Sequence, residues 1–463
     1  METVSLQNIN DAYINKEITV FGRVDTIRTA GQMCFIILRN KLRTLQCMIH
    51  KKTINNNVLF KEIAKIPKES FIEISGILSK LPDEVQKVES CFYKDFELQG
   101  SKINIVSIAS ELPIEIDSAN QIYAEQATDS TRINISLSVR LDNRSLELRA
   151  PMNSCIFKLQ SATTEAFRNY LISKDFIEIH TPKTIGTSSE GGSAVFELKY
   201  FDKKAYLAQS PQLYKQMAIN ADMERVFEIG PVFRAENCVS HRHLCEFTGL
   251  DFEMALIPPY NYIELIDNLW GILITIFEYY ENKYLEETNY LRGISKCDKL
   301  LYSKEPLIFK FSDGVKLLRE NGFHQEEFED LSTENEKQLG NIIKKLTGYD
   351  IFVLCEYPVG ARPFYTMLSD DPRYTKSYDI IMRGEEICSG SQRINNYDKL
   401  IENIKLKNID TKSLEDYLKS FMYGSRPHGG AGLGLERILM LYFGLFNVRL
   451  TSMFPRDSNR ITP

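Results

Sequence analysis

Several arginines in the second half of the 463-residue chain occur in segments suited to binding phosphate or carboxylate groups. Arg234 and Glu236 are followed by a loop rich in arginine and histidine that ends at Phe247. A guanidinium can donate two parallel hydrogen bonds to a phosphate or a carboxylate. Residues 429–437 (GGAGLGLER) place a glycine-rich run just before Arg437. This run lacks the Lys-Ser/Thr pair of a P-loop, and close packing alone would equally explain its glycines.

Three further segments carry polar groups that could act together. Residues 378–380 (YDI) and 384–393 (GEEICSGSQR) contain acidic and hydroxyl side chains, among them Asp379, Glu386 and Ser389. Residues 187–193 (TSSEGGS) and 209–216 (QSPQLYKQ) are, taken alone, a flexible surface loop and a turn leading into a helix. None of these segments identifies a reaction by itself, and only their combination is specific.

Four residues, Cys238, His241, His243 and Cys245, have side chains that bind zinc. The neighbouring Arg242 adds positive charge beside any such ion, so we do not expect zinc here. The nine cysteines include no CxxC pair, which favours reduced thiols in a reducing compartment.

The elements that must position these groups fall into two regions. The first reads as short strands separated by glycine and charged turns, at residues 18–24, 34–39, 45–49, 71–78, 92–98 and 103–108. This spacing predicts a small β-barrel, and a helix is expected at residues 57–66. An OB-fold has this size and strand count, but the pattern alone does not distinguish it from other small barrels.

The second region is predicted to be α+β. Apolar residues at helical spacing predict a helix over residues 153–173, capped by Asn153 or Ser154. A strand at 176–179 should stop before Pro182, and a long helix should cover about 260–284. Strands are also expected at 351–356 and 377–382. We predict three parts: a barrel at 1–110, a linker or hinge at 111–150, and a second domain at 151–463.

Composition narrows the class of protein. The net charge of −6 argues against a protein coated in positive charge that binds any nucleic acid. No apolar run approaches the roughly 20 residues that a membrane span needs. Residues 1–15 show neither a secretory nor a transit pattern. We therefore expect a cytoplasmic protein that does not enter a membrane.

The segments in their order resemble the class II aminoacyl-tRNA synthetases. Arg-x-Glu with its Arg/His loop, and later Gly-x-Gly-x-x-Arg, are similar to motifs two and three of that family. The helix, strand and Pro182 are similar to motif one, which in the family forms the dimer interface. A barrel before the catalytic domain resembles the aspartate, asparagine and lysine subgroup. Residues 210–216 (SPQLYKQ) and 384–390 (GEEICSG) resemble its aspartyl enzymes, in the eukaryotic and archaeal form that lacks the large bacterial insertion.

The resemblance implies a fold and a reaction. The fold would be an OB-fold barrel followed by a catalytic domain whose central antiparallel sheet is flanked by helices. The enzyme would join L-aspartate to ATP, releasing pyrophosphate, and pass aspartate to the 3′ end of tRNA(Asp). ATP is then a substrate, Mg²⁺ the cofactor, and a homodimer the expected assembly.

It also implies roles for individual residues. Catalysis would rest on Arg234, Glu386 and Arg437. ATP would be bound by Arg234, Glu236, Arg242, His243, Leu244, Phe247, Glu386, Gly432, Gly434, Leu435, Glu436 and Arg437. Aspartate would be bound by Glu190, Gln212, Lys215, Arg234, Asp251, Ser389 and Arg393. The metal would be held by Asp379, Glu386 and Ser389, and the dimer interface would include Pro182. The anticodon would be read by Phe35, Gln46 and Glu97.

Several alternatives stay open at this point. Lys215 and Arg393 favour an acidic amino acid over lysine or asparagine, because a neutral side chain would leave buried cations unpaired. An enzyme that charges both tRNA(Asp) and tRNA(Asn) would differ in only a few barrel residues. An inactive paralogue that binds RNA should have lost a phosphate or metal residue, and an asparagine synthetase would not need residues 17–110. Phe35 could instead belong to the barrel core.

Overall fold

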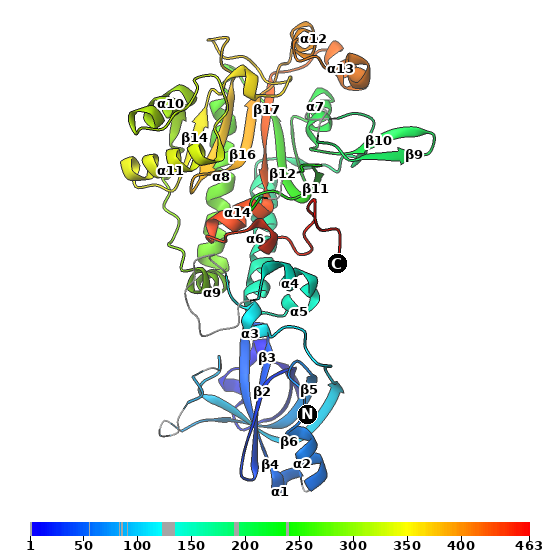
Figure 1. Ribbon diagram of the computed structural model, residues 1–463, viewed down its shortest axis with the longest axis vertical. Helices are drawn as coiled ribbons and strands as arrows, with labels where there is room; N and C mark the ends of the chain where they lie inside the picture. The colour runs from blue at the N-terminus through cyan, green and yellow to red at the C-terminus, as the bar shows by residue number, and fades with distance from the viewer. Residues whose placement is uncertain are drawn as a thin grey trace. The chain divides into compact units, whose positions relative to one another are not determined.

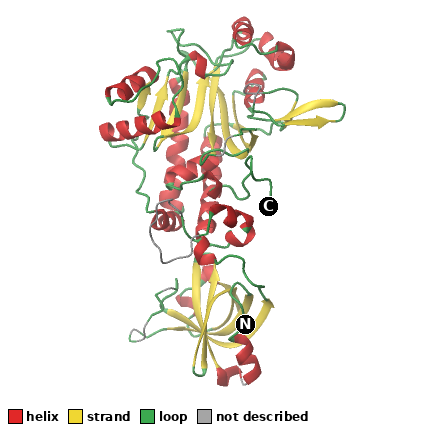
Figure 2. Cartoon of the chain, in the orientation of Figure 1, coloured by secondary structure: helices red, strands yellow, loops and turns green. Residues whose placement is uncertain are grey.

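The computed structural model describes residues 2–54, 56–82, 84, 87–89, 91–122, 135–188, 194–237 and 240–463. The chain divides into two compact units (Figures 1 and 2). The first contains the chain up to Asn120 and a second stretch that ends at Ser154. The second contains the chain from Cys155 to Pro463. Each unit is considered separately below.

The first unit is a closed β-barrel, as the strand pattern predicted. Its strands are β1 (Glu2–Ser5), β2 (Glu17–Ala30), β3 (Met33–Asn40), β4 (Arg43–His50), β5 (Phe71–Lys80) and β6 (Phe96–Ser107). The order is β1-β2-β3-β4-β6-β5, and β2 also pairs with β5 to close the barrel. Alternate residues of each strand point inward, so Cys34, Ile36 and Leu38 of β3 are fully buried in an apolar core. The short helices are α1 (Lys51–Ile54), α2 (Asn57–Ile63), η1 (Leu6–Asn8) and η2 (Asp11–Tyr13).

The two strands predicted at 92–98 and 103–108 are wrong as separate elements, because β6 runs without interruption from Phe96 to Ser107. The polar residues 99–102 resemble a turn in the sequence. In the structure Gly100 packs against the core, where a Cβ would lie 3.0 Å from Ile74 and 3.1 Å from Ile49. The glycine therefore allows close packing inside a strand and does not mark a turn.

The segment predicted as a linker holds three short helices, α3 (Ile116–Ala119), α4 (Leu137–Asp142) and α5 (Arg144–Glu147). Arg140 and Arg144 both contact Glu147 at 2.7 Å, and all three side chains are fully buried. Arg149 pairs with Glu69 of the barrel at 3.3 Å. The first of these ion pairs joins α4 to α5, and the last joins the residues that follow α5 to the barrel within the first unit.

The second unit is built around an eight-stranded sheet with the order β13-β14-β15-β16-β17-β12-β11-β7. The strands are β7 (Ile177–Glu178), β11 (Arg225–Phe233), β12 (Glu246–Ala255), β13 (Ile308–Lys310), β14 (Ile351–Cys355), β15 (Ser377–Met382), β16 (Glu385–Gln392) and β17 (His428–Gly434). The inner strands are antiparallel, and the edge strands β7 and β13 run parallel to their neighbours. A smaller sheet contains β8 (Thr184–Ile185), β9 (Glu197–Tyr200) and β10 (Lys203–Leu207), and β9 and β10 form a projecting hairpin in Figure 1.

Helices flank this sheet, as the α+β prediction required (Figure 2). They are α6 (Pro151–Ser173), α7 (Gln212–Asn220), α8 (Ile263–Glu278), η3 (Tyr279–Lys283), α9 (Leu285–Ser295), α10 (Phe311–Glu320), α11 (Thr333–Thr347), η4 (Val359–Ala361), α12 (Tyr397–Leu406), η5 (Thr411–Leu414), α13 (Glu415–Met422), α14 (Leu435–Tyr442) and η6 (Val448–Leu450). None of the helices in the described ranges is long and apolar enough to span a membrane.

The predicted cap of α6 is wrong. The helix begins at Pro151, a residue whose fixed φ suits the first helical position. The backbone N–H of Met152 donates to Asn120 Oδ1 at 2.8 Å, so a side chain distant in sequence caps the helix. Asn153 lies inside the first turn and donates to the Glu147 carbonyl.

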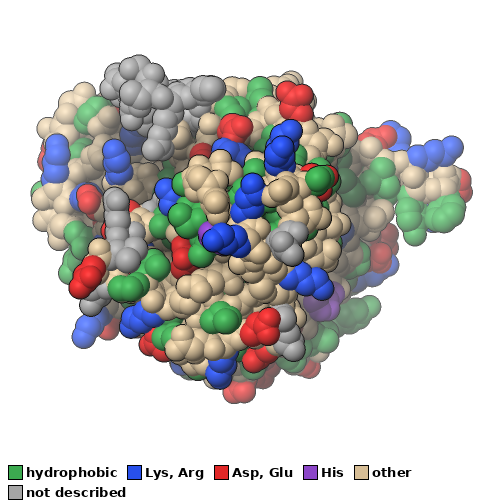
Figure 3. Space-filling model, turned by 90° about the horizontal axis from the view of Figure 1, so that it is seen from below, with side chains coloured by type: hydrophobic (Ala, Val, Ile, Leu, Met, Phe, Trp, Pro, Cys, Tyr) green, Lys and Arg blue, Asp and Glu red, His purple; other side chains and the backbone are tan. Residues whose placement is uncertain are grey.

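Charged side chains of both signs are interspersed on the face seen in Figure 3, without a continuous basic surface there.

Candidate active site

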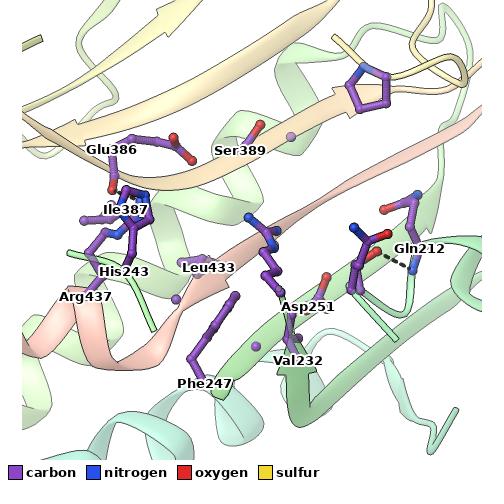
Figure 4. A pocket seen from close by; sticks show the side chains of 18 of the residues that line it. Gln212, Val232, His243, Phe247, Asp251, Glu386, Ile387, Ser389, Leu433 and Arg437 are labelled. Atoms are coloured by element: carbon purple, nitrogen blue, oxygen red, sulfur yellow. Dashed lines mark hydrogen bonds between the residues drawn. The ribbon is translucent and has the colours of Figure 1, made fainter. Parts of the chain in front are cut away.

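A cavity of about 330 Å³ opens on one face of the large sheet (Figure 4). Its position follows from the strand register. Asp379 of β15, Ser389 of β16, Gly432 of β17 and Asp251 of β12 are cross-strand partners in one row. A Cβ at Gly432 would lie 2.9 Å from Asp251 Oδ1, so the glycine leaves open space between polar side chains on either side. Four segments distant in sequence thus meet on one surface.

Arginines and an aromatic ring border one end of the cavity. Arg234 directly follows β11, and its guanidinium lies 5.4 Å from the ring centre of Phe247 on β12. Arg437, in the first turn of α14, donates to the Glu386 carbonyl at 2.9 Å and to the Arg242 carbonyl at 3.3 Å. Figure 4 shows Phe247 and Arg437 at the same end of the cavity. A flat heteroaromatic ring with attached phosphates fits such an arrangement of ring and guanidinium groups.

The loop between β11 and β12 adds further cations. Arg242 donates to Glu336 at 2.6 Å and to the Thr333 hydroxyl at 2.8 Å. The ring of His243 contacts Ser240 Oγ at 2.6 Å and lies 3.6 Å from Glu236. Burial lowers the pKa of His243. Both side chains line the cavity, as do Glu236 and Leu244.

Glu436, next to Arg437 in the glycine-rich segment, is a buried acid. Glu436 accepts hydrogen bonds from the backbone N–H of Thr248 at 3.1 Å, and burial raises its pKa to about 7. Glu436 lines the cavity together with Gly432 and Gly434. Leu435 is buried and is not among the cavity-lining residues.

The opposite end of the cavity contains two buried cations and two buried carboxylates. Lys215 Nζ lies 2.9 Å from Asp251 and 3.7 Å from Glu253. Arg393 donates to Glu253 at 2.8 and 3.1 Å and to Gln212 at 3.2 Å. Burial raises the pKa of Glu253, but the charges of Arg393 and Lys215 outweigh it, so the pKa lies below its usual value.

These residues differ in their access to the cavity. Gln212, Asp251 and Arg393 line it, whereas Lys215 is fully buried and is not among the lining residues. Glu190 lies outside the described residues. Glu253 was missed in the sequence analysis. The alternation of Asp251 and Glu253 with apolar residues along a buried strand was the signal that could have revealed it.

The expected metal ligands are brought together by β15 and β16. Asp379 and Ser389 are cross-strand partners, and Glu386 lies on the same strand as Ser389. The pKa of Asp379 is raised to about 6, mainly by burial. The positive charge of Arg362 lowers this pKa, and the negative charge of Glu386 raises it further. Asp379 Oδ1 is buried and has no hydrogen-bond partner. A cation would relieve both the charge repulsion and the unpaired oxygen.

Arg362 also belongs to this end and was missed in the sequence analysis. It donates to Asp379 at 2.7 Å and to the Ser389 hydroxyl at 2.8 Å, and it lines the cavity. It follows a short 3₁₀ turn in a segment with no recognisable pattern, so no local signal pointed to it. Within the described part of the chain, no three or more His, Cys, Asp or Glu side chains form a metal-binding group. Cys238, which the zinc hypothesis needed, lies outside that part.

On the first unit, the expected anticodon residues lie together on the outward sides of their strands, where Gln46 is covered by its neighbours and is only 5% exposed. Gln46 donates to Glu97 at 2.6 Å and accepts from Arg28 at 3.2 Å. Arg28 also lies 4.8 Å from the ring centre of Phe35. Phe35 is half-buried and is not part of the apolar core, so the core alternative is wrong. Phe35 alternates along β3 with the inward-facing Cys34 and Ile36, which determines its side of the strand.

Pro182 is exposed and follows the edge strand β7. Ile177 of β7 is about half exposed, at 51%. This edge of the sheet therefore presents the apolar side chains of Ile177 and Pro182 to the surface.

Comparisons with known proteins identify the family to which the chain belongs. Residues 136–458 match the family model of class II tRNA synthetases (D, K and N), and residues 18–106 match an OB-fold nucleic acid binding domain. The cytoplasmic aspartate–tRNA ligase of Caenorhabditis elegans is 41% identical over 99% of this chain and 87% of its own length. That of Homo sapiens is 41% identical over 99% and 91%, respectively.

Solved structures give the same result. A putative aspartyl-tRNA synthetase from Leishmania major superposes with a TM-score of 0.92 at 35% identity, over 100% of this chain and 95% of that one. An asparaginyl-tRNA synthetase from Pyrococcus horikoshii, complexed with asparaginyl-adenylate, has a TM-score of 0.85 at 28% identity, over 100% of both chains. The chain therefore belongs to the class II aminoacyl-tRNA synthetases and, within them, to the eukaryotic-type aspartyl-tRNA synthetases.

Proposed function

We propose that this aspartate–tRNA ligase performs its first step in the cavity on the large sheet, with ATP at the end bordered by Phe247 and Arg437 and aspartate at the end bordered by Arg393. The observation that supports this most strongly is the charge arrangement: guanidinium groups at one end, and a buried lysine and arginine at the other.

The reaction joins an aspartate carboxylate to the α-phosphate of ATP and expels pyrophosphate. The carboxylate is already a nucleophile, so the site must align two anions and neutralise their charge. Arg234 would hold the α-phosphate and the α-carboxylate of the substrate. Arg242 and His243 would hold the outer phosphates. Arg437 would lie on the adenine, on the face opposite Phe247, and Glu236 would contact its edge.

Selection of aspartate would depend on the two buried cations. The side-chain carboxylate would be bound by Arg393, which reaches the cavity, with Lys215 behind it. Glu190, Gln212 and Asp251 would bind the α-ammonium group. The neutral side chain of asparagine would leave desolvated charge unpaired, which a site of this kind rejects strongly.

Mg²⁺ fits the acidic side of the cavity. Asp379 and Glu386 would supply carboxylate oxygens and Ser389 a hydroxyl, and the unpaired Asp379 Oδ1 supports a cation there. When bound, the ion would neutralise charge that develops on the phosphates.

The barrel would read the anticodon of tRNA(Asp). An unpaired base would stack on Phe35, and Gln46 and Glu97 would bond to base edges. The named relatives are cytoplasmic enzymes, and this chain is assigned to the same compartment. Two copies would associate through the exposed edge near Pro182; a single-chain mass by light scattering at micromolar concentration would disprove this assembly.

One experiment separates the main alternatives. ATP–pyrophosphate exchange is measured with aspartate, asparagine and lysine, and purified tRNA(Asp) and tRNA(Asn) are then charged. Exchange with aspartate alone and charging of tRNA(Asp) alone is the expected result. Charging of both tRNAs would indicate a non-discriminating enzyme, and no exchange would indicate an inactive paralogue that binds RNA.

A further inference from the structure

The loop that carries Arg242 is held in place along its backbone. The Ser240 carbonyl accepts from Arg449 at 2.9 Å, and the His241 carbonyl accepts from the backbone N–H of Val448 at 2.8 Å. The Arg242 carbonyl accepts from Arg437 at 3.3 Å. The base of the Arg242 side chain therefore has a defined position before any nucleotide binds.

The tip of the same side chain is held by α11, from a part of the sequence that the class II motifs do not include. Glu336 accepts from one terminal nitrogen of Arg242 at 2.6 Å, and Thr333 accepts from the other at 2.8 Å. In the described part of the chain, the Nε of Arg242 makes no hydrogen bond to another residue. Two contacts thus orient the guanidinium and leave donors available toward the cavity that it lines.

Glu336 is well placed for this function. Its side chain is 10% exposed and that of Arg242 is 16% exposed, so solvent weakens their interaction less than it would at the surface. Ser332 caps α11 through the backbone N–H of Asn335, and Leu339 and Ile343 anchor the helix in a separate apolar core. The carboxylate is therefore presented by a rigid element.

We propose that Glu336 is a positioning residue that holds the Arg242 guanidinium ready for the outer phosphates of ATP. This inference rests on the proposed role of Arg242. A free arginine side chain loses considerable rotational freedom when it binds a phosphate, and an arginine already held by Glu336 and Thr333 loses less. Glu336 itself does not contact the substrate in this proposal. Its effect should therefore appear in ATP binding, should leave aspartate binding unchanged, and should require Arg242.

The test is ATP–pyrophosphate exchange with variants of the full chain. Glu336→Ala should raise the KM for ATP about tenfold, the order expected when an arginine must be ordered on binding, and leave the KM for aspartate unchanged. Glu336→Gln should restore most of the ATP affinity, because its amide oxygen still accepts the hydrogen bond. Glu334→Ala is the matched control: Glu334 is exposed on the same helix turn and bonds only to Gln338 within the described residues.

A double variant separates positioning from a general structural effect. Arg242→Ala should raise the KM for ATP, and Glu336→Ala should add nothing in that background. Melting curves check that each variant is folded. If Glu336→Ala had a normal or lower KM for ATP, the inference would be overturned while the role of Arg242 stands. The same would hold if the effects of the two substitutions on the KM for ATP were additive in the double variant. An unchanged KM for ATP in Arg242→Ala would overturn the proposed role of Arg242, and the inference with it.

Discussion

Replacement of Lys215 by leucine tests how the site selects its amino acid. Lys215 Nζ lies 2.9 Å from Asp251 and 3.7 Å from Glu253, and its side chain has no exposed surface. Leucine is apolar and uncharged, and its side chain ends two bonds short of the position of Nζ. The variant would remove the lysine partner of both buried carboxylates; Glu253 would keep its contact with Arg393, next to the position proposed for the aspartate side chain.

The expected size of the effect follows from the burial. Breaking a buried ion pair by removing one partner costs about 3–5 kcal/mol. Each 1.4 kcal/mol corresponds to a factor of about ten, so the full cost would reach a hundredfold or more if it appeared in the transition state. We expect aspartate activation to fall at least about a hundredfold, the order seen when a charged contact in a specificity pocket is lost. Part of the cost would also lower the melting temperature.

The assay is aspartate-dependent ATP–pyrophosphate exchange on folded protein, repeated with asparagine. The preference for aspartate over asparagine should decrease, because one of the two cations that distinguish them is gone. Lys203→Leu, at an exposed position on β10, is the matched control and should behave as the unaltered enzyme. A folded Lys215→Leu variant with unchanged kcat/KM for aspartate would refute the reasoning and leave Lys215 a structural role only.

Three further predictions follow from the same structure. Phe35→Ala should weaken tRNA binding by about 1–3 kcal/mol, the contribution of one base stacked on an aromatic ring, with exchange unchanged; equal loss of both activities would contradict a role in the anticodon site. Chelation of Mg²⁺ should stop exchange, and Glu386→Gln should lower it about a hundredfold with partial recovery at high Mg²⁺, the size expected for lost charge stabilisation; no response to Mg²⁺ would exclude the assigned metal site. Burial raises the pKa of Glu281, but hydrogen bonds from Arg292 and Tyr442 lower it to about 2. The ionised Glu281 should therefore stabilise the folded protein above its usual pKa, and this stabilisation should be lost as the pH falls toward 2. Glu281→Gln should lower the free energy of unfolding by roughly 2 kcal/mol at neutral pH and change it little at pH 2, as measured by urea denaturation.

The sequence alone was sufficient for the family and the reaction, and many of the residues that it singled out line one cavity in the structure. Arg234, Arg437 and the residues around Glu386 occur in long local motifs whose order is specific. The strands at 351–356 and 377–382 were also predicted nearly to the residue, because β-branched and apolar runs with clear ends produce a strong local pattern.

Tertiary structure decided which side chains share a surface and what holds them. Phe35 was ambiguous in the sequence because the phase of a short strand decides which face a residue occupies, and only the barrel determines that phase. Arg362 and Glu336 lie in segments without a motif, and each acts through a partner far away in the chain, Asp379 and Arg242 respectively. Local patterns report local structure, whereas pairing between distant residues depends on how strands and helices pack, so these contacts became visible only in the folded chain.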